Sequence, residues 1–436
     1  MATIQKYKLP GPKSAEYLKM SDTYEPACTC QQAALVWDSA EGVIVRDVDG
    51  NEYIDLTSGV LVTNVGHSHP KHVAAIQEQA ARLLNCYDFP TPQRVELARR
   101  LVEITPENLD HAFLLTTGSE ATEAAMRVSK RYTGRHEILS FYGGFHGRTY
   151  GAMSMAGKMG TKRRFGPIVP GSIYAPYPYC FRCPFGKTPE ECGLFCIEFL
   201  DTVIEVSSTD DLAALIVEPY QGGAGFIFPP DGYLTRLEQW ARDKDIIFIL
   251  DEVQSSFGRT GKFFALEWEG LRPNLLCLGK GIGSGVPTAA LMAESRIMAS
   301  LGRGEMSSTT GGNPLSCAAG LAVLDIMEEE NLVENSRVVG EYMLGRFTEM
   351  ADRFEILGDA RGRGLVMGLE FVKDKESLEP APELTRAVVD SLCEHGVLCG
   401  CLGWHGNVIR VAPPLVITQD QAARVCDTVE QVLATL

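Results

Sequence analysis

Short hydrophobic runs alternate with longer amphipathic stretches through the middle of the chain, between about residues 111 and 330. Runs of this length, bounded by turn residues, are typical of buried strands, and the stretches between them have helical spacing. This alternation predicts a mainly parallel sheet with crossover helices, which is an α/β fold. The predicted strands lie near 112–116, 137–142, 213–217, 246–250, 275–279 and 289–293.

The two ends of the chain follow a different pattern. Residues 1–30 are polar and rich in turn residues, and we expect an irregular arm there. Further elements are predicted as an antiparallel meander over 35–56, helices over 71–84, 93–104, 334–350, 382–395 and 418–434, a β-rich section over 354–372 and a strand near 408–410. We therefore predict an N-terminal arm with part of a small domain (1–65), a large domain (66–330) and a C-terminal small domain (331–436).

Composition and charge exclude several classes of protein. The 436 residues are 45% hydrophobic and 22% charged, which is ordinary for a globular protein with a large core. The formal net charge of −16 argues against nucleic acid or an anionic membrane as the main partner. No apolar run is long enough to span a bilayer, and the N-terminus lacks a signal-peptide pattern. The 13 cysteines are scattered, so we predict a reducing, cytoplasmic location.

Two predicted strands end in residues that bear chemistry. The run 275–278 leads to Gly279-Lys280, and the run 246–250 leads to Asp251. Apolar surroundings disfavour an ammonium group, which lowers the pKa of a lysine and frees its amine to attack a carbonyl. Taken alone, Lys280 is better explained as a surface lysine at a strand end. The carboxyl ends of parallel strands share one edge of a sheet, however, so Lys280 and Asp251 are expected to face each other.

Pyridoxal phosphate requires both residue types, a lysine that binds its aldehyde and a carboxylate that keeps its ring nitrogen protonated. The motif from Ile249-Leu250-Asp251-Glu252-Val253-Gln254 through Gly258-Arg259-Thr260-Gly261 to Gly279-Lys280 resembles the class III (ω-amino acid, 4-aminobutyrate-type) aminotransferases of fold type I. The resemblance extends from about Asp47 to Pro414. It implies a seven-stranded, mainly parallel sheet between helices, a smaller α+β domain and pyridoxal 5'-phosphate as cofactor.

The resemblance assigns cofactor contacts to several segments. Gly118 and Ser119 match the phosphate loop, where a glycine admits the phosphate and a helix N-terminus binds it. Ser119 is otherwise an ordinary helix cap. Phe145 occupies the position that stacks on the cofactor ring, and His146 is either a polar group of the site or a hydrogen-bonded neighbour of it. The complete predicted cofactor set is Gly118, Ser119, Phe145, His146, Asp251, Val253, Gln254, Lys280 and Thr309, with Lys280 and Asp251 catalytic and no metal.

Three further residues match the substrate side of the family. Arg410 corresponds to the substrate arginine, whose guanidinium gives two-point recognition of a carboxylate. Glu218 corresponds to a glutamate near the cofactor that pairs with this arginine in the family. Val60 lies in the substrate loop, at a position where dialkylglycine decarboxylases have glutamine, so decarboxylation is disfavoured.

The implied reaction is ping-pong transfer of an amino group from an ω-amino acid resembling 4-aminobutyrate, or a related amine, to 2-oxoglutarate or another α-keto acid. Racemisation or epimerisation of amino acids stays open, as does a non-catalytic protein of the same fold. Thr309 lies in a loop that reaches the neighbouring subunit's cofactor in the family, which implies a homodimer with shared active sites and leaves a tetramer open.

One cluster lies outside these assignments. Cys180, Cys183, Cys192 and Cys196 fall within 17 positions, and such spacing suits a zinc or iron–sulfur site as well as thiols or a disulfide. The surrounding residues predict a surface insertion between sheet elements, for which we favour thiols or a disulfide without metal.

Overall fold

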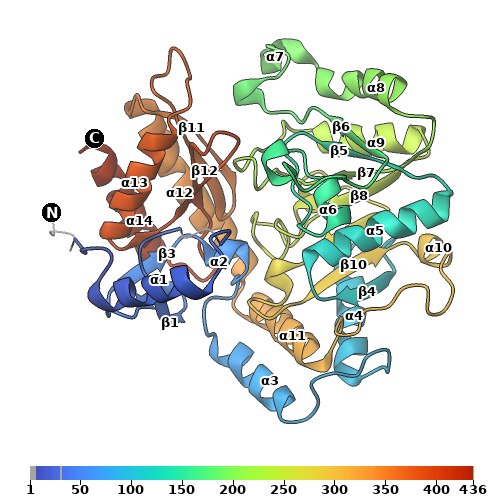
Figure 1. Ribbon diagram of the computed structural model, residues 1–436, viewed down its shortest axis with the longest axis horizontal. Helices are drawn as coiled ribbons and strands as arrows, with labels where there is room; N and C mark the ends of the chain where they lie inside the picture. The colour runs from blue at the N-terminus through green and yellow to red at the C-terminus, as the bar shows by residue number, and fades with distance from the viewer. Residues whose placement is uncertain (1–5, 30–31, 436) are drawn as a thin grey trace. The chain divides into compact units, whose positions relative to one another are not determined.

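A computed structural model describes residues 6–29 and 32–435 (Figure 1). Contacts divide the chain into two compact units. Unit 1 consists of Met1–Pro70, Gly258–Gly261 and Asn331–Leu436, and unit 2 consists of Lys71–Phe257 and Lys262–Glu330. The division into domains 1–65, 66–330 and 331–436 stays a prediction.

Unit 2 is built on a seven-stranded sheet. Its strand order is β4 (His111–Leu115), β10 (Ala289–Ala293), β9 (Leu275–Leu278), β8 (Ile247–Asp251), β7 (Leu212–Val217), β5 (Glu137–Phe141) and β6 (Ser172–Ala175). The five strands from β9 to β6 are parallel, while β10 runs antiparallel to both of its neighbours. The predicted fold class, a mainly parallel seven-stranded sheet of fold type I, is confirmed.

Helices cover both faces of this sheet, because alternate strand residues enter two separate hydrophobic clusters. Ile216, Ile249 and Leu291 pack with the helix α5 (Gly118–Thr133), whereas Val217 and Leu250 pack on the opposite face. That second cluster includes residues of α4, α8, α9 and α11. These four helices are α4 (Pro92–Ile104), α8 (Phe195–Ser207), α9 (Tyr233–Asp243) and α11 (Pro314–Glu329). The remaining α-helices of the unit are α3 (Pro70–Ala80), α6 (Tyr150–Ser154), α7 (Pro189–Cys192) and α10 (Ser295–Met298).

Unit 1 joins the two ends of the chain. One sheet has the order β1 (Trp37–Glu41), β2 (Ile44–Asp47), β3 (Glu52–Asp55) and β13 (Val397–Leu398), so a C-terminal strand completes the N-terminal meander. The other sheet is antiparallel, in the order β11 (Leu357–Arg363), β12 (Val366–Phe371), β15 (Val408–Val411) and β14 (Gly400–Leu402). The long helices of the unit are α12 (Leu332–Arg353), α13 (Pro382–Glu394) and α14 (Gln419–Leu433).

The N-terminal segment differs from the prediction. Residues 12–24 form the helix α1 (Pro12–Tyr24), where an irregular arm was expected. Pro12 stands in the first turn of the helix, where its missing N–H costs nothing and its fixed φ suits the helix, so the proline that indicated a turn begins α1 instead. The first five residues of the predicted arm lie outside the described residues, as do residues 30 and 31.

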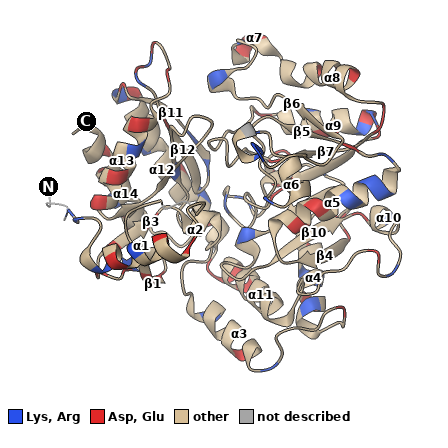
Figure 2. Ribbon diagram, viewed as in Figure 1, with Lys and Arg blue, Asp and Glu red and all other residues tan. Residues whose placement is uncertain are grey.

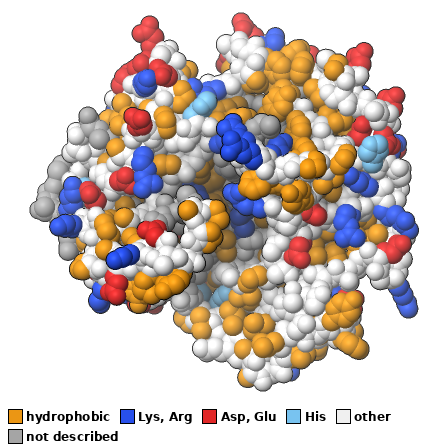
Figure 3. Space-filling model, in the orientation of Figure 1, with side chains coloured by type: hydrophobic (Ala, Val, Ile, Leu, Met, Phe, Trp, Pro, Cys, Tyr) orange, Lys and Arg blue, Asp and Glu red, His pale blue; other side chains and the backbone are white. Residues whose placement is uncertain are grey.

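Charged side chains are spread over the surface of both units. Acidic residues predominate along α13 and α14, each of which has a single arginine (Figure 2), and acidic side chains occupy several separate places on the face drawn in Figure 3. The net negative charge is therefore not gathered into one patch on that face. None of the described helices combines the length and the apolar character needed to cross a bilayer.

Candidate active site

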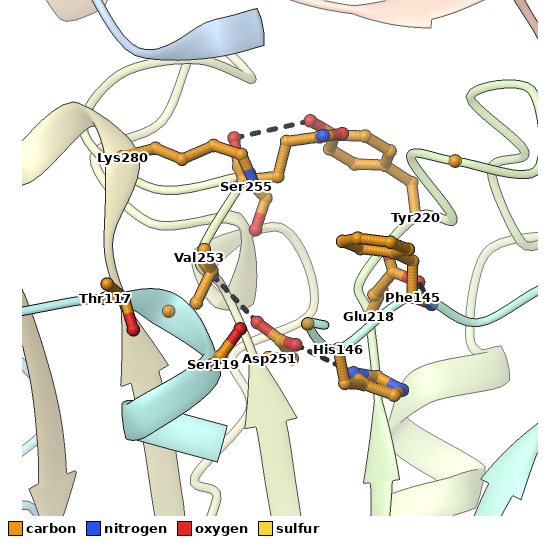
Figure 4. Close-up of a pocket in the computed structure, with 14 residues that line it drawn as sticks. Thr117, Ser119, Phe145, His146, Glu218, Tyr220, Asp251, Val253, Ser255 and Lys280 are labelled. Atoms are coloured by element: carbon orange, nitrogen blue, oxygen red, sulfur yellow. Dashed lines mark hydrogen bonds and ion pairs between the residues drawn. The ribbon is translucent and has the colours of Figure 1, made fainter. Parts of the chain in front are cut away.

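A cavity of unit 2 lies where the parallel strands end (Figure 4). The strands β7 and β8 lead into it through Glu218 and Asp251, and β9 leads into it through Lys280. Nine of the predicted cofactor and substrate residues therefore line one cavity. The lining residues are Thr117, Gly118, Ser119, Phe145, His146, Gly147, Glu218, Tyr220, Gly223, Asp251, Val253, Gln254, Ser255 and Lys280.

Lys280 begins a single 3-10 turn, η4 (Lys280–Ile282), directly after Gly279. Its backbone has a φ of +45°, a left-handed conformation that side-chain-bearing residues rarely adopt and that often marks functional sites. Burial lowers the pKa of the Lys280 ammonium, while the charges of Asp251 and Glu218 oppose this shift. A lysine amine with a lowered pKa in a cavity is a nucleophile and a base.

Asp251 is the last residue of β8, and both of its carboxyl oxygens have partners. Oδ1 accepts a hydrogen bond from the Val253 backbone N–H at 3.0 Å, and Oδ2 lies 2.7 Å from Nδ1 of His146. His146 and Asp251 are 3% and 5% exposed. A buried carboxylate held by two partners keeps one orientation, so His146 is a hydrogen-bonded neighbour of Asp251 that also lines the cavity.

The cavity also receives the N-terminus of α5. Thr117 caps this helix and forms a capping box with Glu120, so the alternative in which Ser119 is the cap is wrong. The Ser119 hydroxyl instead accepts a hydrogen bond from the backbone N–H of Arg148 at 3.2 Å. A Cβ on Gly118 would lie 2.6 Å from Cγ1 of Val253, so only glycine brings the helix backbone this close. Exposed amides at a helix N-terminus bind anions such as phosphate.

Glu218 holds two loops of the cavity. Its Oε1 accepts the N–H of Phe145 at 2.9 Å, and its Oε2 accepts the N–H of Gly222 at 3.0 Å. Burial raises the pKa of this carboxyl to about 7, and the nearby charge of Asp251 adds to the rise, while His146 and the two amides oppose it. Glu218 thereby fixes the backbone that carries the Phe145 ring.

Gln254 supplies a polar atom without a partner. Its side-chain oxygen is buried and has no hydrogen-bond partner among the described residues. A Cβ on Gly222 would lie 2.0 Å from this oxygen, so the neighbouring loop leaves room for the amide only because residue 222 is glycine.

These features fit pyridoxal phosphate. An amine of lowered pKa, a fixed carboxylate, an aromatic face and a helix N-terminus match the aldehyde, ring nitrogen, ring and phosphate of that cofactor. The side-chain amide of Gln254 also fits, because its NH2 group can donate a hydrogen bond to the oxygen on the cofactor ring. Lys280, Asp251, Phe145 and the Gly118–Ser119 backbone are therefore the groups that would hold it.

The remaining predicted residues lie elsewhere. Thr309 is exposed and is absent from the cavity lining. Val60 and Arg410 belong to unit 1. Val60 lies in α2 (Ser58–Leu61), where four consecutive residues, three of them not glycine, have positive φ. Arg410 is buried in β15.

Several lining residues escaped prediction. Thr117, Gly147, Tyr220, Gly223 and Ser255 each lie within five positions of a predicted site residue, and this proximity was the available signal.

The four clustered cysteines are free thiols in the structure. Burial raises the pKa of Cys196 to about 12, and the three neighbouring thiols add to this rise. Within residues 6–29 and 32–435, no group of three or more His, Cys, Asp or Glu side chains is arranged to hold a metal ion.

The fold and the cavity together define a pyridoxal-phosphate-dependent enzyme of fold type I. Comparison with known sequences agrees, because the sequence model described as Aminotransferase class-III matches residues 27–433. The chain belongs to the class III aminotransferase family. Both the predicted family and the predicted cofactor are confirmed.

Similar proteins include members with different reactions. The chain is 36% identical to the alanine/serine racemase of Pyrococcus horikoshii, over 98% of this chain and 91% of the racemase. It is also 36% identical to the 4-aminobutyrate aminotransferase of Mycobacterium leprae, over 98% and 97% of the two chains. Among solved structures, the (S)-enantioselective omega-transaminase from Thermomicrobium roseum superposes with a TM-score of 0.91 at 32% identity, covering 97% and 98% of the chains.

Proposed function

We propose that this enzyme is an aminotransferase that moves an amino group from an ω-amino acid resembling 4-aminobutyrate, or a related amine, to 2-oxoglutarate or another α-keto acid. The observation that carries the proposal is Lys280, an amine of lowered pKa on the same cavity as Asp251 and the N-terminus of α5. Similarity to the Mycobacterium leprae 4-aminobutyrate aminotransferase supports the donor class.

The residues of this chain have distinct tasks in the proposed reaction. Pyridoxal phosphate, when bound, supplies an electron sink for the substrate carbon. Lys280 would hold the cofactor through its Nζ, and the same amine would take up and return the substrate proton as general base and acid. Asp251, held by His146, would face the ring nitrogen of the bound cofactor. Phe145 would support the face of the ring, and Glu218 fixes the loop of Phe145.

Substrate recognition in the proposal belongs to Arg410. Its guanidinium binds the carboxylate of the α-keto acid through two parallel hydrogen bonds. We further propose that two copies of the chain form a homodimer in which the exposed Thr309 reaches the phosphate of the partner's cofactor. Light scattering of the purified holoenzyme tests this point, since a monomer at working concentration would refute it.

Racemisation or epimerisation of α-amino acids is the second candidate, and the similarity to the Pyrococcus horikoshii racemase favours it. Lys280 would serve both reactions, because both begin by removing a proton from the carbon that bears the amine. They differ afterwards, since a racemase returns the proton to the same carbon and needs no keto acid. Decarboxylation is less supported because Val60 stands where the decarboxylases have glutamine, and a non-catalytic role conflicts with the complete set of cofactor residues.

One experiment separates these candidates. The holoenzyme is incubated with 4-aminobutyrate or with single L-amino acids, each with and without 2-oxoglutarate, and glutamate and the enantiomers of each amino acid are quantified. The proposal expects glutamate formation that requires both substrates. Conversion of an L-amino acid to its D-form without keto acid, and no glutamate from any donor, would establish the racemase instead.

A further inference from the structure

The guanidinium of Arg410 has a hydrogen-bond partner from the opposite end of the chain. The side-chain oxygen of Gln32 accepts a hydrogen bond from Nη2 of Arg410 at 2.5 Å. Arg410 is 8% exposed and Gln32 is half-buried, so this contact is partly buried. Gln32 belongs to the segment that precedes β1, and both residues lie in unit 1.

The neighbouring strand leaves room for this contact. Gly400 of β14 pairs directly with Arg410 of β15. A Cβ on Gly400 would lie 2.7 Å from the Gln32 side-chain oxygen and 3.1 Å from Nη2 of Arg410. Gly400 is not among the glycines with positive φ, so its backbone does not require glycine. The space beside the Gln32–Arg410 contact is tight, so a Cβ at residue 400 would displace one or both of these side chains from their hydrogen bond.

We propose that Gln32 is a positioning residue that fixes the plane of the Arg410 guanidinium for a substrate carboxylate. The inference rests on the proposed function in one respect, namely that Arg410 binds the carboxylate. A guanidinium presents five N–H donors in a rigid fork, so one hydrogen bond to Nη2 restrains the direction of all the others. An amide oxygen does this without a negative charge, and it therefore does not compete with the substrate for the charge of Arg410.

The substrate class follows from this chemistry. A guanidinium of fixed plane recognises a planar carboxylate beside the reacting carbon, as in α-keto acids and α-amino acids. An amine without a carboxylate does not use this contact. With such an amine as donor, Gln32 therefore affects the half-reaction of the keto acid and leaves the half-reaction of the donor unchanged.

The test uses the holoenzyme with two variants that remove the same contact by different routes. Gln32→Leu removes the acceptor, and Gly400→Ala fills the space. We expect both to weaken 2-oxoglutarate binding, measured by calorimetry, by about tenfold, because a hydrogen bond to a charged group is lost. The KM for 2-oxoglutarate rises equally and kcat changes less. The double variant binds 2-oxoglutarate no more weakly than either single variant, since both substitutions act on one interaction. The rate with 1-phenylethylamine in the absence of keto acid, followed by cofactor absorbance, stays within twofold of wild type.

Two further variants sharpen the result. Gln32→Glu keeps an acceptor of the same reach but adds a charge that neutralises Arg410, so it is expected to weaken 2-oxoglutarate binding more than Gln32→Leu does. Cys401→Ala, at the exposed neighbour of Gly400, is the matched control and leaves binding unchanged. Thermal unfolding midpoints within about 2 °C of wild type exclude a general loss of fold.

Unchanged 2-oxoglutarate affinity in Gln32→Leu and Gly400→Ala would overturn the inference, as would equal losses for the keto acid and for 1-phenylethylamine. If the wild type binds 2-oxoglutarate but forms no glutamate, only the proposed transamination is refuted. The ratio of variant to wild-type affinity for 2-oxoglutarate would still test the role of Gln32. Absence of binding by the wild type would refute the carboxylate role of Arg410 and the inference with it.

Discussion

Replacing Arg259 with methionine is expected to destabilise unit 1 strongly, because this fully buried guanidinium connects three segments of that unit. Nη1 donates to the carbonyl oxygens of Leu365 at 2.9 Å and Pro413 at 2.5 Å, and Nη2 donates to Oδ1 of Asn64 at 2.9 Å. Nη2 also lies 3.5 Å from the Ser58 hydroxyl, at the left-handed turn that carries Val60. Methionine fills similar volume but donates to none of these acceptors.

The magnitude follows from the acceptors left behind. Each buried carbonyl or amide oxygen that loses its donor costs about 1–3 kcal/mol. Three such acceptors, with partial relaxation, give a loss of about 3–5 kcal/mol. For a unit of this size, about 2–4 °C of midpoint is lost per kcal/mol, so the midpoint should fall by roughly 6–20 °C.

Differential scanning calorimetry of the holoenzyme measures this shift. Arg337→Met is the control, since Arg337 also makes several side-chain contacts, but these are ion pairs with Glu334 and Glu341 on the surface of α12 in the same unit. Exposed ion pairs contribute at most about 1 kcal/mol, so this control should move the midpoint by only a few degrees. An Arg259→Met midpoint within 2 °C of the control would refute the reasoning.

Two further predictions concern the cavity. Gly118→Ala places a Cβ 2.6 Å from Cγ1 of Val253, so it should weaken pyridoxal phosphate binding by about tenfold or more, measured by cofactor titration. The control is Gly345→Ala in α12, where the Cβ meets open space, and it should raise the free energy of unfolding by about 0.5–1 kcal/mol. Equal cofactor affinity in both variants would contradict this account of Gly118. The pKa of Glu218 is raised from 4.5 to about 7, so its contribution to stability is fully present below pH 4.5 and is lost as the pH rises through 7, by about 3 kcal/mol in all. Relative to Glu218→Gln, urea unfolding of the wild type should show this loss between pH 4.5 and 7, and a flat difference would contradict it. Glu252, whose pKa burial also raises to about 7 but which does not line the cavity, should show the same loss of stability with rising pH relative to Glu252→Gln, which checks the argument at a second buried carboxyl.

Four of the five parallel strands of unit 2, namely β5, β7, β8 and β9, were predictable because each is buried along its whole length and is mainly apolar. β6 (Ser172–Ala175) was absent from the strands predicted by pattern, because only its alternate residues are buried. Ligands bind at the carboxyl ends of parallel strands. This rule and the amino-acid pattern were enough to place Lys280 and Asp251 at one edge of the sheet.

Other features depend on contacts between distant residues and left no local signal. The left-handed run Ser58–Leu61 contradicts the preferences of Val60 and Leu61, and Arg259 and the segment that follows β15 hold this run in place. A motif arginine such as Arg259 reads as a surface residue in the sequence, yet it is completely buried. Gln32 and Arg410 are 378 positions apart, and only the fold joins them.

The covalent attachment of the cofactor to Lys280 is the most direct test of the account. Wild-type enzyme and Lys280→Ala are incubated with pyridoxal phosphate, reduced with borohydride, digested and analysed by mass spectrometry. We predict a visible absorption band in the wild type and a phosphopyridoxyl group on the peptide that contains Lys280, with neither in the variant. A label on another lysine, or a wild type that carries no label and absorbs like Lys280→Ala, would contradict it.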